Sequence, residues 1–279
     1  MAHPSSTPLA GSSASDEATH LRAELARSQQ QVADMAAAQE EFLRAVSHDL
    51  RAPLRHVTAY GALVREVLGD LPPEVVQGDP VQEALGFLAT MDQSARRMGQ
   101  MIDGLQALVR VGRAPLHLQP VPLAAAVAQA RSALAAQQGA RDVDWQVAEG
   151  LPTLQADPAL LHELLVQLLG NALKFTRPVA RAHIAVLADA AAPAGGGGFA
   201  VQDNGVGFDP ARASGLFGVF QRLHRENEFD GVGAGLALCR AIAQRHGAGI
   251  GITASPAPDS GCTVRVEWPA AALRGATAA

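Results

Sequence analysis

The chain has 279 residues, a length typical of two domains, and its apolar content of 48% is enough to bury a sizeable core. Acidic residues (27) outnumber basic ones (22), and the formal charge of -5 argues against binding of nucleic acid over a broad basic surface. The two cysteines, Cys239 and Cys262, lack metal-ligand spacing, and no apolar run is long enough to cross a bilayer. We therefore expect a cytoplasmic protein with reduced thiols and no membrane span.

The chain begins with a segment rich in Ser, Ala and Pro, residues 1–16, which is typical of disorder. Residues 17–68 predict one long helix, because apolar positions recur every three or four residues. The members of this stripe are Leu21, Leu25, Ser28, Val32, Met35, Gln39, Phe42, Val46 and Leu50. Their spacing is that of a coiled coil, which the polar members Ser28 and Gln39 weaken locally.

A second periodic helix follows the first after a short connection. Gly and Pro residues at 69–73 end the first helix, and the second begins at 78–80 and runs to about residue 112. Two such helices predict a helical hairpin. Because its apolar stripes have no other partner in the chain, we expect residues 17–112 to form a four-helix bundle from two copies.

A histidine beside a carboxylate lies inside the first helix, in the segment Ser47-His48-Asp49-Leu50-Arg51-Ala52-Pro53-Leu54. His48 comes two residues before Leu50, about 200° around the helix, so it points away from the apolar stripe toward solvent. Neutral imidazole is a nucleophile near pH 7, and Asp49 is placed to take its proton. Pro53 removes a backbone hydrogen bond and predicts a bend near this histidine.

The second half of the chain alternates helices and strands. A linker at 112–120 leads into an α/β domain, residues 113–270, and the Ala-rich tail at 271–279 predicts disorder. Helices are expected at 121–137, 158–175 and 236–246, and strands at 143–147, 183–187, 199–202, 249–253 and 263–268.

The predicted helix at 158–175 carries a polar face beside its leucines. Glu163, Gln167, Asn171 and Lys174 share this face at steps of four, four and three. The Asn171 oxygen can ligate Mg²⁺, and the Lys174 ammonium can meet phosphate oxygens. Most polar helix faces are simply solvated, so the pattern alone leaves both readings open.

Two glycine-rich segments follow this helix. Asp203-Asn204-Gly205-Val206-Gly207 comes directly after a predicted strand, and its carboxylate can accept a hydrogen bond from an exocyclic amine. Gly231-Val232-Gly233-Ala234-Gly235-Leu236 precedes a helix, whose free N–H groups attract anions. Residues 208–230 between them, with Phe217 and Phe220, have the length of a mobile lid. Each segment alone is also typical of an ordinary turn, and only their order and spacing are specific.

In this order the elements resemble a bacterial sensor histidine kinase. Residues 47–54 are similar to its H box, 168–176 to its N box, 203–207 and 231–236 to its two glycine boxes, and 216–222 to its F box. The resemblance covers about residues 40–268, and the lid is similar to that of the kinase cores attached to phytochrome-type sensors. It implies a histidine-phosphotransfer hairpin followed by an ATP-binding α/β two-layer sandwich of the Bergerat (GHKL) type.

The resemblance also implies roles for individual residues. His48 would accept a phosphoryl group, Asp49 would take the proton, and Arg51 would assist. Asn171 would hold Mg²⁺, Lys174 would contact phosphate, and Asp203 would read the adenine amino group. The other expected ATP-site residues are Gly205, Gly207, Phe217, Phe220, Gly231, Gly233, Gly235 and Leu236. The remaining histidines considered, which we expect to be structural or on the surface, are His56, His117, His162, His183, His224 and His246.

The implied function is that of a homodimeric, ATP- and Mg²⁺-dependent protein-histidine kinase that passes the phosphoryl group from His48 to an aspartate of a response regulator receiver domain. A Bergerat-type ATPase or serine kinase is one alternative, against which the H box argues. A non-catalytic dimeric scaffold is the other, against which the intact Asn171, Lys174 and Asp203 argue.

Ala52 stands where kinases that are also phosphatases usually carry Thr or Asn, so we predict weak phosphatase activity. No sensor domain is recognisable, and we expect input through the N-terminal coil, a separate sensor protein or a small-molecule site.

Overall fold

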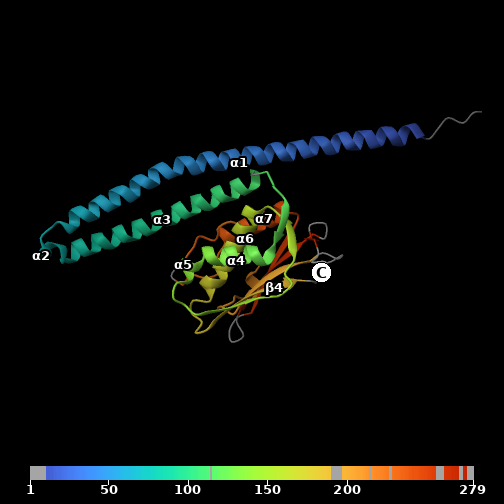
Figure 1. Ribbon diagram of the computed structural model, residues 1–279. Helices are drawn as coiled ribbons and strands as arrows, with labels where there is room; N and C mark the ends of the chain where they lie inside the picture. Colours follow the sequence, from blue (N-terminus) through green and yellow to red (C-terminus); the bar gives the residue numbers. More distant parts are fainter. Residues whose placement is uncertain are drawn as a thin grey trace, which may run out of the picture.

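A long helical hairpin and an α/β domain make up the computed structural model (Figure 1). The structure describes residues 11–113, 115–189, 197–213, 215–225, 228–255, 261–269 and 273–274. Across these ranges, none of the helices combines the length and the hydropathy that a membrane span requires.

The hairpin consists of α1 (Gly11–Gly69) and α3 (Asp79–Arg113), joined by the short helix α2 (Pro73–Val76). α1 and α3 lie side by side, and α1 extends well beyond the end of α3 (Figure 1). The helices approach closely where Gly61 faces Met91, since a Cβ at Gly61 would lie 3.1 Å from Met91 Cε. Pro53 lies inside α1, which continues through it as one gently curved helix. The predicted hairpin is confirmed.

The α/β domain is built on a five-stranded sheet with the order β2-β4-β5-β7-β6. Its strands are β2 (Val143–Val147), β4 (Ala182–Asp189), β5 (Gly197–Asp203), β6 (Gly249–Ser255) and β7 (Gly261–Trp268). β2 and β4 are parallel, and the other neighbouring strands are antiparallel. Three helices pack on one face of this sheet: α4 (Leu123–Ala133), α6 (Pro158–Phe175) and α7 (Gly235–Arg245). This arrangement confirms the predicted two-layer α/β sandwich.

Helix α6 has the bounds that the sequence predicts, because its start is specified locally. The Asp157 carboxylate accepts hydrogen bonds from the backbone N–H groups of Ala159 (3.0 Å) and Leu160 (3.2 Å). His246 of the α7 end accepts a hydrogen bond from the Asp157 backbone N–H at Nε2 (3.0 Å) and donates from Nδ1 to the Ile242 carbonyl (2.8 Å). His246 is therefore structural, as expected. The fully buried leucines of α6 are Leu161, Leu164, Leu165, Leu168, Leu169 and Leu173.

A second, smaller sheet was not predicted. Its order is β1-β3-β8, with β1 (Gln119–Pro122), β3 (Thr153–Ala156) and β8 (Leu273–Arg274). The predicted linker at 112–120 is shorter at both ends, because α3 runs to Arg113 and β1 begins at Gln119. Residues 121–122, expected in a helix, belong to β1 instead, since prolines are tolerated in a strand that lies at a sheet edge. The predicted helix at 121–137 is two helices, α4 and α5 (Ala135–Gln138).

Both predicted disordered ends contain described elements. α1 begins at Gly11, so residues 11–16 are helical, because extending an existing helix costs far less than nucleating one. Leu273 and Arg274 of the tail pair with Leu154 and Thr153 of β3. Residues 1–10, 271–272 and 275–279 lie outside the described residues.

Candidate functional site

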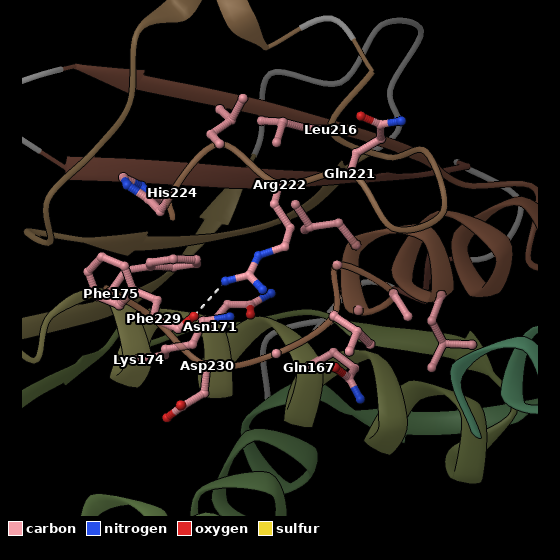
Figure 2. Close-up of a pocket in the computed structure, with 18 of the residues that line it drawn as sticks. Gln167, Asn171, Lys174, Phe175, Leu216, Gln221, Arg222, His224, Phe229 and Asp230 are labelled. Atoms are coloured by element: carbon pink, nitrogen blue, oxygen red, sulfur yellow. Dashed lines mark hydrogen bonds between the residues drawn. The ribbon is translucent and has the colours of Figure 1, made fainter. Parts of the chain in front are cut away.

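A cavity of about 610 Å³ opens between α6, the lid, α7 and α3 (Figure 2). The polar face of α6 lines it with Glu163, Gln167, Asn171 and Lys174. The structure thus brings together the side chains that their helical spacing placed on one face. This face is the wall of a cavity and not a simply solvated surface.

Lys174 supplies positive charge to the cavity at a reduced pKa. Burial lowers the pKa of its ammonium to about 8, and the nearby cations Arg222 and Arg177 act in the same direction. Lys174 Nζ lies 4.4 Å from the centre of the Phe175 ring, a cation–π contact. An anionic ligand placed here would replace missing water around a desolvated cation.

The second glycine box borders the cavity with Gly231, Gly233, Gly235 and Leu236, and the first glycine box reaches it with Gly207. Gly233 has a φ of 78°, and a Cβ there would lie 2.5 Å from the Gln221 carbonyl oxygen. Only glycine fits this position, which lets the backbone pass closely beneath the lid. The predicted glycines at 207, 231, 233 and 235 therefore lie together in space.

Asp203 lies at the end of β5 and is 8% exposed. Burial raises its pKa to about 6, against hydrogen bonds with the backbones of Gly205 and Cys262. The Gly205 N–H donates to Asp203 Oδ1 at 2.9 Å. Neither Asp203 nor Gly205 is among the described residues that line the cavity, although the neighbouring Cys262 and Gly207 are.

The side chains that the lid contributes to the cavity wall are not those of the two expected phenylalanines. Leu216, Gln221 and Arg222 line the cavity, whereas Phe217 and Phe220 are not among its described lining residues. Phe220 has a φ of 63° and donates its N–H to the Gly233 carbonyl (3.0 Å), so it joins the lid to the second glycine box through its backbone.

Sequence reasoning missed several residues of the cavity wall. His224, which we expected to be structural or on the surface, lines the cavity together with Phe175 and Phe229. Figure 2 shows these three rings on the same side of the cavity. The hairpin adds Gln100, Asp103, Gly104 and Ala107 from α3. The position of Phe175, directly after Lys174, was a signal that the sequence offered, but nothing local to α3 indicates that it lines this cavity.

The H box lies on α1, outside the cavity. His48 and Asp49 are 86% and 80% exposed, and His48 Nδ1 lies 3.1 Å from Asp49 Oδ1. Arg51 Nη2 donates to Asp103 Oδ1 (2.7 Å) and to Gln106 Oε1 (2.8 Å). The predicted exposure of His48 and its pairing with Asp49 are therefore present, but the structure does not bring His48 to Asn171 or Lys174. Arg51 reaches the cavity wall only through Asp103.

The described part of the chain contains no cluster of three or more His, Cys, Asp or Glu side chains able to hold a metal ion alone. The amide oxygen of Asn171, a hard ligand in the cavity wall, suits a metal ion that also binds phosphate oxygens. The donor set thus fits a cation that arrives with a nucleotide.

Both parts of the chain match known families. Residues 156–272 match the family described as histidine kinase-, DNA gyrase B-, and HSP90-like ATPase. Residues 38–113 match the His Kinase A (phospho-acceptor) domain. The first match covers most of the α/β domain, and the second covers the whole of α3 and the part of α1 that carries His48.

Individual relatives agree with these matches. The methanogenesis regulatory histidine kinase FilI of Methanothrix harundinacea is 29% identical over 215 residues, which are 76% of this chain and 23% of the relative. Cyanobacterial phytochrome B of Nostoc sp. is 29% identical over 234 residues, which are 83% of this chain and 29% of the relative. The crystal structure of full-length ShkA in complex with AMPPNP has a TM-score of 0.56 and 25% identity, covering 85% of this chain and 47% of that chain.

The chain spans less than a third of the length of these two curated relatives and about half of the solved structure. This chain carries a phosphoacceptor helix pair followed by an ATPase domain, with segments similar to the H box, N box and glycine boxes in that order. The chain therefore belongs to the sensor histidine kinases.

Proposed function

We propose that this chain transfers the γ-phosphoryl group of ATP to His48 and then to an aspartate of a response regulator receiver domain. The observation that carries the proposal is the exposed His48–Asp49 pair, 3.1 Å apart, on the same chain as a cavity lined by Asn171 and Lys174. A nucleophile with its base and a nucleotide site are the two parts that such a transfer needs.

The pairing of His48 assigns a task to each ring nitrogen. Because Nδ1 faces the Asp49 carboxylate, Nε2 is the nitrogen left to attack. In the proposed step Nε2 forms a bond to the γ-phosphorus, the bond from that phosphorus to the β,γ-bridging oxygen breaks, and ADP leaves. Asp49 accepts the proton from Nδ1. Arg51 is paired with Asp103 and Gln106 in this structure, so its expected assistance to the phosphoryl group requires that pairing to open.

The cavity residues bind and orient the nucleotide in this proposal. Lys174 contacts the phosphates, and Asp203 accepts a hydrogen bond from the adenine amino group at the other end of the site. The glycines at 205, 207, 231, 233 and 235 and the residues Phe217, Phe220 and Leu236 shape the pocket and the lid. Asn171 holds Mg²⁺, which when bound neutralises charge on the phosphates. The similar protein ShkA, whose full-length crystal structure is a complex with AMPPNP, supports an adenine nucleotide as the ligand of this chain.

The test is phosphorylation of the full chain with γ-labelled ATP and Mg²⁺. We expect an acid-labile, base-stable label on the wild type and none on His48→Gln, because the variant lacks the nucleophile. The matched control is His56→Gln, which changes an exposed histidine two turns further along α1 and should keep the label. Label that persists on His48→Gln would end the assignment.

We propose that the functional unit is a homodimer, with residues 17–112 as the dimerising domain and residues 113–270 as the ATP-binding domain. The exposed apolar side chains of α1 support this, among them Phe42, Leu50 and Val57. Input reaches the kinase through the α1 coil, a separate sensor protein or a small-molecule site.

Ala52 predicts that the chain is a poor phosphatase toward its regulator. Its methyl group cannot orient a water molecule for attack on the phosphorylated aspartate, whereas a Thr or Asn side chain could. We expect phosphorylated regulator mixed with the kinase and ADP to decay at close to its spontaneous rate. Robust, ADP-stimulated dephosphorylation would contradict this prediction.

A further inference from the structure

Three aromatic rings meet at one side of the nucleotide cavity. The ring centroids of Phe175 and His224 lie 5.4 Å apart, those of Phe175 and Phe229 lie 5.0 Å apart, and those of His224 and Phe229 lie 5.1 Å apart. All three residues line the cavity (Figure 2). Tilted and edge-on contacts at these distances are attractive beyond the area that they bury.

The rings come from two segments that lie about fifty residues apart in the sequence. Phe175 is the last residue of α6, directly after Lys174, while His224 and Phe229 belong to the lid. Phe229 is 7% exposed and the His224 side chain 25% exposed. The cluster therefore fastens the second half of the lid to the helix that carries the N box.

His224 makes one contact that the phenylalanines cannot make. Its ring forms a hydrogen bond with the backbone of Gly207, at the end of the first glycine box. Burial lowers the pKa of the His224 imidazole, Glu228 and the Gly207 hydrogen bond raise it, and Lys174 and Arg212 lower it further, so that the net shift favours the neutral ring. A neutral imidazole keeps one N–H donor for this bond.

Other bonds hold the same end of the lid. Arg177 pairs with Asp230 at 2.8 Å, and Arg222 Nη2 donates to the Phe229 carbonyl at 2.6 Å. These bonds join the lid to the end of α6 and to itself. Among these contacts of the lid, only that of His224 reaches the first glycine box.

We infer that His224 is a nucleotide-positioning residue, which joins the lid to α6 through its ring and to the first glycine box through its N–H group. The inference rests on the proposed ATP site and adds to it a residue outside the motifs that define that site. A lid held in place before the nucleotide arrives loses less conformational entropy on binding, so the affinity for ATP is higher. His224 itself takes no part in the transfer to His48.

The test compares three variants of the full chain with the wild type. His224→Ala removes both contacts, His224→Phe keeps the ring, and His224→Gln keeps an N–H donor. Binding of AMPPNP with Mg²⁺ is measured by calorimetry, and the rate and KM for ATP are measured in autophosphorylation. The matched control is His162→Gln, a histidine of α6 that does not line the cavity.

We expect His224→Ala to weaken AMPPNP binding about tenfold, because the variant loses one hydrogen bond and both ring contacts. KM for ATP should rise to the same extent, and the rate at saturating ATP should stay within about twofold of the wild type. His224→Phe and His224→Gln should each recover part of the affinity, and His162→Gln should match the wild type.

An affinity of His224→Ala within twofold of the wild type would overturn the inference. So would a purely structural effect, in which the melting temperature without nucleotide falls but the folded protein binds AMPPNP normally. If the wild type and His48→Gln themselves fail to bind AMPPNP, the proposed function fails instead, so the two failures are distinguishable.

Discussion

At the scale of single residues, burial shifts the pKa values of Asp203 and Lys174, two ionisable groups of the proposed nucleotide site, in opposite directions. The pKa of Asp203 rises to about 6 and that of Lys174 falls to about 8, because a desolvated group resists its charged form. Both groups would recover favourable interactions from a ligand that offers an amine at one end and phosphates at the other. Without the ligand, the ionised forms of Asp203 and Lys174 therefore lower the free energy of unfolding.

The first prediction concerns the pH dependence of stability at Asp203. Between pH 3.8 and about 6 the folded chain keeps a proton on Asp203 that the unfolded chain releases. The free energy of unfolding therefore falls as pH rises through this window, by on the order of 3 kcal/mol in total, and stays lowered above it. Asp203→Asn avoids this loss, so it should be more stable than the wild type at pH 7.

Chemical denaturation of both proteins at several pH values measures the difference. The stabilisation by Asp203→Asn should grow between pH 3.8 and about 6 and then level off, while binding of ATP weakens. Asp142→Asn, at an exposed carboxylate, is the matched control substitution. A stability difference that does not change with pH would refute the assignment.

At the scale of elements, the crossing of α3 over α7 decides how the hairpin meets the ATPase domain. Gly104 of α3 faces Ala234 at the start of α7, and a Cβ on Gly104 would lie 2.7 Å from the Ala234 Cβ. Arg245 of α7 also donates to the carbonyls of Val111 and Gly112. The second glycine box therefore lies directly against the hairpin.

Gly104→Val should separate these two elements. Overpacking of this kind costs about 1–3 kcal/mol, so the contact should open at least about fivefold more often. Hydrogen exchange of the backbone amides at 233–238 should become faster by that factor, while helix content stays unchanged. Gly86→Val on the same helix is the control, because a Cβ there meets nothing within 4 Å. Equal exchange rates in the two variants would contradict the proposed contact.

At the scale of the whole molecule, the single chain leaves a long apolar stripe of its hairpin exposed. Val57 and Val64 of α1 are 39% and 47% exposed, and further members of the stripe are similarly open. Apolar patches of this extent mark an interface, and the described part of the chain supplies no cover for this one. A second copy covers it in the proposed dimer.

Replacing Val57 and Val64 with Asp should give a monomer. Burying two unpaired carboxylates in the interface would weaken dimerisation more than about a hundredfold, whereas the single chain exposes both positions and should fold normally. Sedimentation velocity measures the oligomeric state. The control replaces the exposed neighbours Thr58 and Arg65 with Asp, and a double variant at Val57 and Val64 that remains dimeric would refute the interface.

The features that the sequence alone determined are local ones. The stripes of α1 and α3, the exposure of His48 and the bounds of α6 follow from helical periodicity and from a cap within a few residues. The order of the H, N and glycine boxes identified the family for the same reason, since each box is a short segment whose chemistry lies in adjacent residues.

Only the tertiary structure decided which distant residues complete the site. The β1-β3-β8 sheet joins strands that lie far apart in the chain, and proline in β1 hides it from any local pattern. His224 and Asp103 line the cavity because the lid and α3 pack against α6 and α7, and no spacing along the chain encodes that contact. The same packing places His48 outside the cavity, since α1 reaches this site only through α3. Periodicity specifies the face of an element, whereas the partner of that face depends on how the whole chain packs.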